Sequence, residues 1–566
     1  MIKIKAQADL SQWYQKDAPE SAQDQILNCL LDQRQISEDF LSPSLKLIPD
    51  PFLLPQMRES LDLFYDHFIN GQKIMLVGDY DVDGVTSTAL LLRFFTIINL
   101  ENKAWFIPNR LKHGYGLTDL SAAEIIKQAP DLVITLDNGI TAANGVRLLK
   151  EAGIKVIITD HHEPVAGSVP DCIVVNPKLA SSRFPDREVA GVGVAFLWVT
   201  ALRSYLREKN FWAEQSPPDE PNLLEHLDLV ALGTIADQVP LKGVNRIFAK
   251  FGLEQMNRCF HAPATKLWHH YVKAFGEKMK VTVFDSQLLA FRLAPLINAT
   301  GRMGDPAPSL GFLCSPDHKQ ALLNLKDLQK TNNTRKSRQD KMLKKAKNLA
   351  ERQGFDKGGL VLYDTTFHEG ISGIVAHRIL DETGLPVCVL TKNKEGIIKG
   401  SLRSKKESVL EALTQCSEHL LQFGGHRNAG GCALTEEQLP EFTTALQAAF
   451  LSSKTVTDID MVADLEVTPE MLSYELITSL KKLEPFGKDN QQPLFMLRDL
   501  YLDEPQILAA KHLKWHLDDD LELIYWNGVG KVPSDMSNPT VAAHLSENNF
   551  QGSWRKQLIL QGISFS

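Results

Sequence analysis

The sequence predicts a multidomain α/β protein built around a parallel sheet, on three observations. The chain has 566 residues, which is enough for about three to five domains. Between residues 71 and 180, apolar strand patterns alternate with helical patterns, as is typical of a doubly wound parallel sheet. Polar residues directly follow several of the predicted strands, at the edge where such sheets bind ligands.

Composition and targeting signals narrow the class of protein. Apolar residues make up 43% of the chain, and no run is long enough for a transmembrane helix. The N-terminus lacks the apolar core of a signal peptide, so we expect a cytoplasmic protein with no membrane partner. The seven cysteines form no C-x-x-C pair, which argues against a zinc knuckle or a disulfide framework. A net charge of −8 does not exclude nucleic-acid binding, because such binding needs only a local basic face.

The first half of the chain is expected to contain a lead-in and then the sheet. Residues 1–70 are predicted to be mostly helical, interrupted by prolines, and to carry no chemistry. The five candidate strands are 73–77, 104–107, 132–136, 155–159 and 172–175. Helical segments, such as 118–128 and 142–152, lie between them.

Three carboxylates follow the first strand at alternate positions. They are Asp79, Asp81 and Asp83, ahead of Gly84 and the hydroxyl-rich start of a predicted helix. Clustered carboxylates repel one another, and hard divalent cations such as Mg²⁺ or Mn²⁺ are their natural counter-charge. The alternative interpretation is a solvated acidic turn.

Further carboxylates and a histidine pair follow later strands. Asp137 comes after the third strand, Asp160, His161 and His162 after the fourth, and Asp237 after a later apolar run that we interpret as another strand. We expect these residues to meet at one edge of the sheet. Carboxylates with imidazole suit a two-metal hydrolytic site, in which a shared carboxylate bridges two ions and an activated water attacks phosphorus. Any one of these Asp residues alone would be explained as a turn or a helix cap.

The chain has a second adjacent histidine pair, which we interpret differently. His269 and His270 lie in a helical, aromatic stretch and are predicted to pack or to face solvent. His161 and His162 directly follow a strand and are flanked by acidic residues, so they are the candidates for chemistry.

A basic segment follows the predicted catalytic region. Residues 298–306 are expected to form a loop because of their Gly and Pro content, and Arg302 in it could bind phosphate. Residues 326–352 are predicted to form one long helix with ten Lys/Arg against three Asp/Glu. The basic side chains of this helix either bind a nucleic-acid backbone through electrostatic contacts or only face solvent.

The C-terminal half is expected to contain two more domains. Residues 353–452 begin a second α/β unit with glycine-rich stretches that contain Ser401, Arg403 and His426 and are typical of anion sites. After about residue 453, short strands predict a small barrel, at 493–496, 512–516, 523–525, 540–545 and 556–562. Four aromatic residues there either stack bases or belong to the core, and they are Phe495, Trp515, Tyr525 and Trp526.

These motifs in this order resemble the DHH/DHHA1 phosphoesterase superfamily, and within it the bacterial exonucleases that degrade single-stranded DNA from 5′ to 3′. The resemblance runs from about residue 30 to the C-terminus and rests on residues 78–84, 108–116, 137, 160–162 and 231–237. It implies a parallel-sheet DHH domain, a long connecting helix, a DHHA1 α/β domain and a C-terminal OB-fold β-barrel. The implied divisions are a lead-in at 1–70, the DHH catalytic domain at 71–240, a helical connector with the basic helix at 241–352, the DHHA1 substrate-binding domain at 353–452 and the OB-fold domain at 453–566.

The resemblance also implies a role for each matching residue. The implied ligands of two divalent cations, Mn²⁺ or Mg²⁺, are Asp81, Asp83, Asp137, His161 and Asp237, with Asp137 as the bridge. His162 is implied to contact the scissile phosphate, while Asp79 and Asp160 either ligate a metal or orient its ligands. The implied catalytic residues are His162, Asp137 and Asp160. The implied contacts with DNA or phosphate are Arg110, Tyr115, Arg302, Ser401, Arg403 and His426.

The function that this resemblance implies is metal-dependent 5′→3′ degradation of single-stranded DNA in repair and recombination. The implied partners are single-stranded DNA with a 5′ end, a single-strand-binding protein and a RecQ-type helicase, and a monomer is expected. One alternative is a DHH phosphodiesterase acting on oligoribonucleotides or cyclic dinucleotides, which the chain length, the basic helix and the barrel disfavour. The other is a non-catalytic DHH-fold scaffold that binds DNA. Such a scaffold should have lost metal ligands, whereas every expected position is filled.

Overall fold

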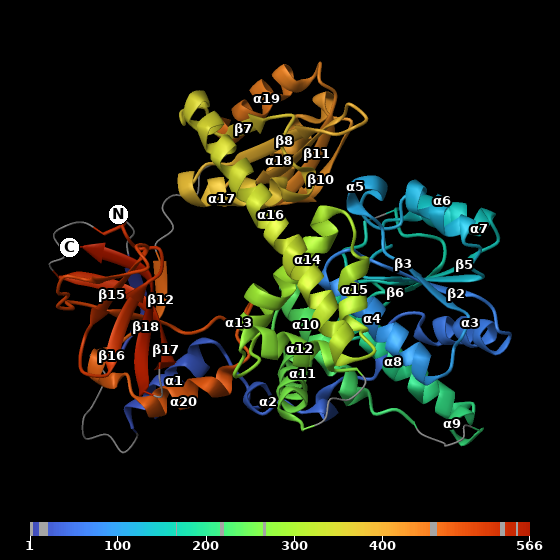
Figure 1. The fold of residues 1–566 in the computed structure, drawn as a ribbon, viewed down its shortest axis with the longest axis horizontal. Coiled ribbons are helices and arrows are strands. Elements are labelled where there is room, and N and C mark those ends of the chain that lie inside the picture. The colour runs from blue at the N-terminus through green and yellow to red at the C-terminus, as the bar shows by residue number, and fades with distance from the viewer. Residues whose placement is uncertain are drawn as a thin grey trace. The chain divides into compact units, whose positions relative to one another are not determined.

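The computed structural model describes residues 4–10, 21–165, 167–214, 220–263, 268–452, 461–532, 538–550 and 553–565 (Figure 1). The chain divides into two compact units. We call the first the β unit, and it consists of Met1–Ile48, Pro240–Lys250 and Thr457–Ser566. We call the second the α/β unit, and it consists of Pro49–Val239 and Phe251–Val456. Within the described residues, no helix is both long and apolar enough to cross a membrane.

A five-stranded parallel sheet forms the first half of the α/β unit and confirms the predicted alternation. The strand order is β3-β2-β4-β5-β6, and every pair is parallel. The strands are β2 (Ile74–Gly78), β3 (Lys103–Phe106), β4 (Leu132–Leu136), β5 (Lys155–Thr159) and β6 (Ile173–Val175). β2 and β4 are buried at every position, as expected for central strands covered on both faces. Helices α6 (Asp119–Lys127) and α7 (Ala143–Glu151) pack on one face, and α4 (Val82–Ile97) and α8 (Gly191–Glu208) on the other.

The apolar run before Asp237 is not a strand, contrary to the prediction. It forms helix α10 (Leu227–Ala236), in which every residue from Leu227 to Ile235 is buried, and Asp237 is its C-cap. A run that is apolar on all sides does not distinguish a buried strand from a buried helix. Asp237 therefore reaches the sheet edge from a helix end.

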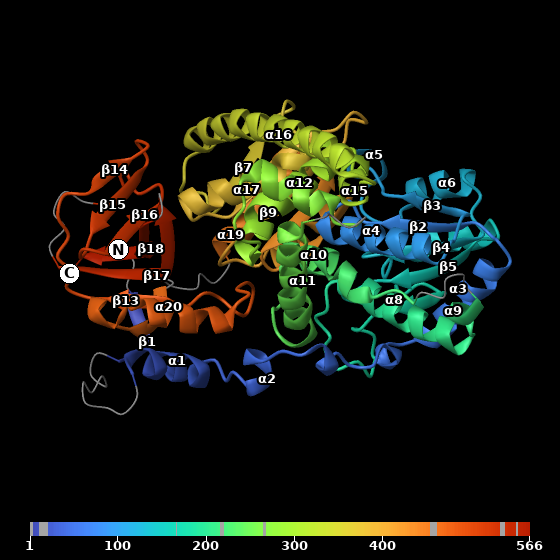
Figure 2. The ribbon, with the colours of Figure 1, turned by 60° about the horizontal axis from the view of Figure 1, so that its bottom comes forward.

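Helices connect the two halves of the α/β unit. After α11 (Gly243–His261) and α12 (His270–Met279) come α14 (Ala294–Met303), α15 (Ala307–Leu313) and α16 (His318–Gln353). Figures 1 and 2 show α16 as one unbroken helix, so the predicted long helix is confirmed and begins earlier than expected. The predicted loop at 298–306 is wrong, because α14 continues to Met303. Gly301 lies inside that helix, where an added Cβ would come within 2.5 Å of the Tyr80 carbonyl oxygen.

A second, mixed sheet forms the other half of the α/β unit. Its order is β10-β11-β9-β8-β7, and only β7 and β8 pair in parallel. The strands are β7 (Leu360–Tyr363), β8 (Val387–Lys392), β9 (Ile398–Arg403), β10 (Gln422–His426) and β11 (Ala429–Leu434). Helices α17 (Glu369–Thr383), α18 (Val409–Gln415) and α19 (Leu439–Ser452) cover it. The C-terminal half of α16 packs against α17 through Met342, Ala346 and Ala350.

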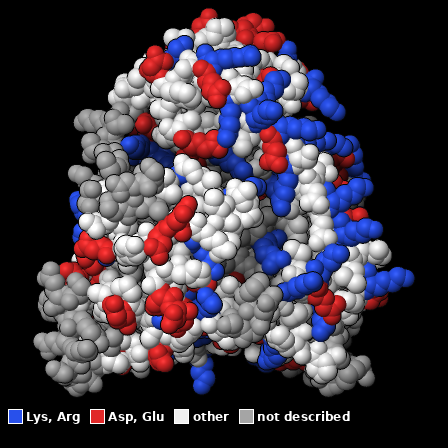
Figure 3. All heavy atoms as spheres, turned by 60° about the vertical axis from the view of Figure 1, so that its left-hand side comes forward, with Lys and Arg blue, Asp and Glu red and all other residues white. Residues whose placement is uncertain are grey.

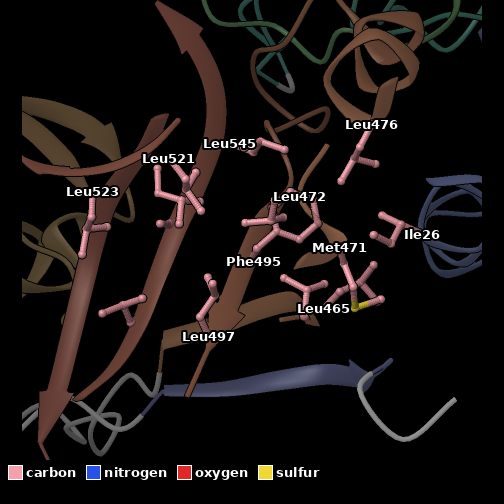
Figure 4. Packing of buried hydrophobic residues seen from close by; sticks show 14 of the residues in the cluster. Ile26, Leu465, Met471, Leu472, Leu476, Phe495, Leu497, Leu521, Leu523 and Leu545 are labelled. Atoms are coloured by element: carbon pink, nitrogen blue, oxygen red, sulfur yellow. The ribbon is translucent and has the colours of Figure 1, made fainter. Parts of the chain in front are cut away.

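The β unit contains an eight-stranded sheet of order β1-β12-β13-β17-β18-β16-β15-β14. The strands are β1 (Ile4–Asp9), β12 (Met461–Glu466), β13 (Leu494–Leu497), β14 (Gln506–Leu508), β15 (His512–His516), β16 (Leu521–Tyr525), β17 (Pro539–Phe550) and β18 (Ser553–Phe565). Figure 4 shows its core, in which Phe495, Leu521 and Leu545 lie with Ile26 of α1 (Ala22–Gln33) and Leu476 of α20 (Tyr474–Leu480).

One expectation for the β unit needs correction. The lead-in does not begin as a helix, because Ile4–Asp9 pairs in parallel with β12. The signal was the alternation Ile-Lys-Ala-Gln-Ala-Asp, which has the period of a strand. Among the four aromatic residues for which both a core position and base stacking were left open, Phe495 and Trp515 lie in the core, whereas Trp526 is 49% exposed.

Candidate metal centre and phosphate cleft

The carboxyl ends of neighbouring parallel strands bring the predicted carboxylates and imidazoles together. Asp79 follows β2, Asp137 follows β4, and His161 follows β5. The Nε2 atom of His161 lies 3.1 Å from Oδ1 of Asp137, 3.8 Å from Oδ2 of Asp83 and 3.7 Å from Oδ2 of Asp237. The structure therefore places His161 at the centre of three carboxylates from three different elements.

Helix N-termini fix the orientation of Asp81 and Asp83. Asp81 is the N-cap of α4 and accepts from the Gly84 amide at 3.1 Å. The two oxygens of Asp83 accept from the amides of Gly191 and Val192, both at 2.7 Å, in the first turn of α8. The positive end of a helix stabilises a carboxylate in this position. A Cβ at Gly191 would lie 2.6 Å from Oδ1 of Asp137, so only glycine allows α8 to approach both residues. The sequence analysis missed this glycine.

Asp160 is hydrogen-bonded through both oxygens. Its Oδ2 accepts from the Ile140 amide at 2.9 Å. Its Oδ1 accepts from the amides of His161 and His162 and lies 2.7 Å from Nδ1 of His162. Although burial raises the pKa of Asp160, the hydrogen bond and charge of His162 outweigh it and lower this pKa. Burial opposes protonation of His162, but the hydrogen bond to Asp160 raises its pKa to about 9. The Tyr115 hydroxyl lies 3.1 Å from Nε2 of the same ring.

Three buried polar atoms in the cluster lack hydrogen-bond partners in the described structure, and they are Asp79 Oδ1, Asp137 Oδ1 and His161 Nε2. An unsatisfied buried polar atom costs about 1–3 kcal/mol. Burial and neighbouring carboxylates raise the pKa values of Asp79 and Asp137. Burial, and then Asp237, raises that of Asp83 to about 7. The buried carboxylates of the cluster therefore lack a positive counter-charge.

Divalent cations fit this cluster. Three groups have ligand atoms within 4.8 Å of one another, and they are Asp137, His161 and His162; Asp83, His161 and Asp237; and Asp79, Asp81 and Asp137. Asp137 and His161 each belong to two of them. Oxygen ligands with one imidazole suit Mn²⁺ or Mg²⁺, and a carboxylate shared between groups is what two adjacent ions require.

Four arginines from different elements interact electrostatically in the α/β unit, and we call them the cleft arginines. They are Arg110 of α5 (Arg110–His113), Arg302 at the end of α14, Arg335 of α16 and Arg403 of β9. Burial, and then repulsion from the other three, lowers the pKa of Arg302 to about 10. Among the described residues, no carboxylate forms an ion pair with any of the four. Half-buried cations without paired carboxylates indicate a site for anions.

Arg403 is packed closely against α17. Its Nη1 donates to the Leu402 carbonyl at 2.6 Å. A Cβ added at Gly373 would lie 2.8 Å from its Nη2 and 3.7 Å from Oγ of Ser401, so these three residues are neighbours. His426 ends β10 and is exposed, and its ring accepts from the Asn428 amide of its own hairpin at 3.3 Å. No hydrogen bond within the described structure joins His426 to the arginines.

Arg335 is the cleft arginine that the sequence analysis did not single out. Its Nε donates to Asn332 at 3.0 Å, and its Nη1 donates to Gln339 at 2.8 Å. Both amide side chains are buried. They orient the guanidinium but, being neutral, do not neutralise its positive charge, which can therefore bind an anion. Polar residues three and four positions on either side of one arginine were the available signal.

The basic run on α16 contains two distinct sets of side chains. Lys345 pairs with Asp364, and Lys347 with Glu382, both at 2.6 Å. Another set lines a shallow groove along the helix with Gln329, Asn333, Thr334 and Ser337. We call this set the α16 stripe, and it consists of Lys326, Lys330, Arg338 and Lys341. Figure 3 shows Lys and Arg side chains gathered in a column down the right-hand side of the face that it draws.

The sheet with its cluster, the long helix and the second α/β half define a phosphoesterase of the DHH–DHHA1 class. The chain matches the DHH family N-terminal domain over residues 73–234, the DHHA1 domain over 356–452 and the RecJ OB domain over 463–562. The single-stranded-DNA-specific exonuclease RecJ of Haemophilus influenzae is 33% identical, and the match covers 92% of this chain and 93% of that protein. This chain therefore belongs to the RecJ family.

Other relatives agree with this assignment. The RecJ of Bacillus subtilis is 32% identical, and the match covers 91% of this chain but only 64% of that longer protein. The crystal structure of Thermus thermophilus RecJ in complex with Mn²⁺ has a TM-score of 0.81 and 30% identity, and the match covers all of this chain and 80% of that one. A second structure of that protein is in complex with Mg²⁺, with a TM-score of 0.75.

Proposed function

We propose that this protein is a metal-dependent exonuclease that hydrolyses single-stranded DNA from the 5′ end. The observation that carries the proposal is the position of His161 among the Asp83, Asp137 and Asp237 carboxylates. Within the described residues, the buried His161 Nε2 and Asp137 Oδ1 atoms lack hydrogen-bond partners. The names of the relatives support single-stranded DNA as the substrate. The complete set of ligands disfavours a non-catalytic scaffold.

The proposed metal ligands are Asp81, Asp83, Asp137, His161 and Asp237. Two divalent cations, when bound, would activate water and neutralise charge on the phosphate. Asp137 has a left-handed backbone (φ 62°) and belongs to two ligand groups, so it is the proposed bridge. A buried oxygen of Asp79 lacks a hydrogen-bond partner among the described residues, and Asp79 lies within ligand distance of Asp81 and Asp137, which favours a ligand role. Asp160 uses both oxygens on other partners, so its proposed role is to orient His162.

His162 is the proposed donor to the scissile phosphate. Asp160 holds its Nδ1 and keeps the ring protonated at neutral pH. A protonated ring offers its Nε2 proton to a phosphate oxygen, and a charge-assisted hydrogen bond of this kind is strong. Tyr115 lies beside Nε2 and would keep the ring in that orientation.

The 5′ polarity requires a pocket for the end of the strand, because a two-metal centre alone does not distinguish one end from the other. The proposed terminal-phosphate pocket consists of Arg110, Arg302, Ser401 and Arg403. Arginines bind phosphate through paired hydrogen bonds, and mutual repulsion between these cations is relieved when an anion binds. The alternative is that Arg403 contacts internal phosphates only. The exposed position of His426 disfavours it as a member of the pocket.

Two further surfaces are proposed to bind the strand. The α16 stripe would follow the backbone through electrostatic contacts. In the β unit, the exposed Trp526 is the proposed base-stacking residue. By family membership, we propose a monomer that acts in the cytoplasm in DNA repair and recombination, with a single-strand-binding protein and a RecQ-type helicase as partners.

Digestion of end-labelled oligonucleotides tests this proposal. With Mn²⁺ present, a 5′ label on single-stranded DNA should appear in the first mononucleotides released, while a 3′ label stays in shortening fragments. Blunt duplex DNA of the same sequence should resist. Faster hydrolysis of short oligoribonucleotides or cyclic dinucleotides would favour the phosphodiesterase alternative, and binding without hydrolysis would favour the scaffold.

A further inference from the structure

A buried ion pair joins α4 to α10 at the ends of these helices that lie away from the metal cluster. Nη1 of Arg93 lies 3.4 Å from Oδ1 and 3.3 Å from Oδ2 of Asp228, and both side chains are fully buried. Nη2 of Arg93 donates to the Leu313 carbonyl at 2.8 Å, and the Tyr271 hydroxyl donates to Asp228 at 2.9 Å. The pair therefore belongs to a small polar network inside an apolar core.

The same two helices meet again at the metal cluster. Near the start of α4, a Cβ added at Gly233 of α10 would lie 2.5 Å from Oγ1 of Thr86 and 2.9 Å from Oδ1 of Asp83. The helices run antiparallel, since the start of α4 lies beside the end of α10. Arg93 lies about 15 Å along α4 from Asp83, at about 1.5 Å per residue. The two helices thus touch closely at the cluster and are joined by the ion pair farther along.

Burying this polar network in the core costs desolvation free energy that apolar side chains would not cost. Nε of Arg93 lacks a hydrogen-bond partner in the described structure, and so does Nδ1 of His269, whose Nε2 lies 3.8 Å from Oδ2 of Asp228. Well-packed apolar residues in place of a buried ion pair are often as stable or more stable. Apolar contacts have no direction, however, whereas the forked guanidinium bonds both Asp228 and the Leu313 carbonyl at a single register of α4 against its neighbours.

We infer that Arg93 and Asp228 are positioning residues that fix the register of α4 against α10, and thereby the spacing of the Asp83 and Asp237 carboxylates that hold one divalent cation. Each metal-ligand helix carries one member of the pair and one of these carboxylates. Asp83 lies in the first turn of α4, and Asp237 caps the end of α10. The inference rests on the proposed metal site.

The test removes the network without leaving a buried charge. The triple variant Arg93→Met, Asp228→Leu, Tyr271→Phe replaces it by apolar side chains of similar size and should fold with a melting temperature at or above that of the full-length wild type. Titration calorimetry with Mn²⁺ alone measures the metal sites without requiring nuclease activity. Wild type should bind two ions. In the triple variant, affinity at one site should fall by about 10- to 100-fold, as is typical when support for metal ligands is lost.

A matched control and a second variant keep the test decisive. Leu149→Ala creates a cavity in the apolar cluster on the other side of the sheet and should lower the melting temperature without changing either Mn²⁺ affinity. If the triple variant does not fold, Arg93→Lys is the second variant, because it keeps the positive charge but loses the forked guanidinium. It should show the same loss of Mn²⁺ affinity at one site. Wild-type affinity at both sites in the folded variant overturns the inference. Failure of the wild type to bind Mn²⁺ would instead overturn the proposed metal site.

Discussion

The Nε2 atom of His161 lies 3.1 Å from the Oδ1 atom of Asp137, and neither atom has a hydrogen-bond partner in the part of the chain that the structure describes. The two residues follow adjacent parallel strands, β4 and β5, so the fold itself brings them together. Both side chains are almost fully buried. A cation bound between two such buried ligand atoms would satisfy both of them.

Asp160→Asn should separate orientation from metal binding. Loss of the carboxylate charge lowers the pKa of His162 from about 9 towards that of a free imidazole, so the ring loses its proton near pH 8. Turnover at about pH 8 should fall by about 10²-fold, the scale of a positioned proton donor, while Mn²⁺ affinity stays near that of wild type. Asp137→Ala is the contrasting variant and should lose Mn²⁺ binding and cleavage but keep single-strand binding. A large loss of Mn²⁺ affinity in Asp160→Asn would make Asp160 a ligand.

Gly373→Ala should weaken recognition of a 5′-phosphate although the residue carries no charge. The new methyl group would lie 2.8 Å from Nη2 of Arg403, so the guanidinium must move out of the proposed pocket. Wild type should prefer 5′-phosphorylated over 5′-hydroxyl single strands. Arg403→Ala should erase much of that preference, and Gly373→Ala should reduce it severalfold, measured as the ratio of kcat/KM values.

Gly311→Ala is the matched control for this prediction. It lies in α15, and its added Cβ meets only Asn324, at 3.8 Å. It should leave the substrate ratio unchanged. If Arg403→Ala slows both substrates equally, Arg403 contacts internal phosphates and does not belong to a terminal pocket.

Replacing the α16 stripe by glutamine should make single-strand binding less dependent on salt. Each phosphate contact that is lost removes about 0.7 from the slope of log K against log salt. Fluorescence anisotropy of a labelled oligonucleotide at several salt concentrations measures this slope. Lys345→Gln with Lys347→Gln is the control, because those lysines are already paired with Asp364 and Glu382. Equal slopes for the stripe variant and wild type would show that the stripe is a solvated face.

Metal-free protein should lose stability as the pH rises from about 4 to 7. Burial and then Asp237 raise the pKa of Asp83 from 3.8 to about 7, so in this window the folded state binds more protons than the unfolded state. Mn²⁺ competes with that proton, and its affinity should therefore rise with pH up to about 7. Calorimetry in two buffers with different ionisation enthalpies should detect proton release at about pH 6. Binding that releases no proton would show that the ion avoids Asp83.

The sequence was sufficient to predict the parallel sheet and most of the cluster. Strands β2, β4 and β5 are apolar runs that end in polar residues, and in a parallel sheet those ends must meet. The run before Asp237 was predicted as a strand because an element buried on all sides has no periodicity. Its closing carboxylate nevertheless lies beside the predicted cluster, since a buried helix end reaches the same edge of the sheet.

Contacts between distant residues could not be predicted from the sequence. The pairing of Arg93 with Asp228 depends on how two helices pack, and neither residue belongs to a motif. The acceptors that orient Arg335, in contrast, lie three and four positions away on the same helix, and what the sequence does not show is that both are buried. The hydrogen bonds that direct both oxygens of Asp160 to backbone amides and to His162 depend on the path of the loop after β5, and the proposed orienting role of Asp160 rests on them.

The measurement that tests the central claim most directly is anomalous diffraction at the manganese edge from crystals of the full-length protein grown with Mn²⁺. The proposed two-metal centre predicts two peaks about 3.5–4 Å apart, both in contact with the Asp137 carboxylate. One should lie between Asp83, His161 and Asp237, and the other beside Asp79 and Asp81. A single peak at full occupancy, or peaks that do not contact Asp137, would contradict it.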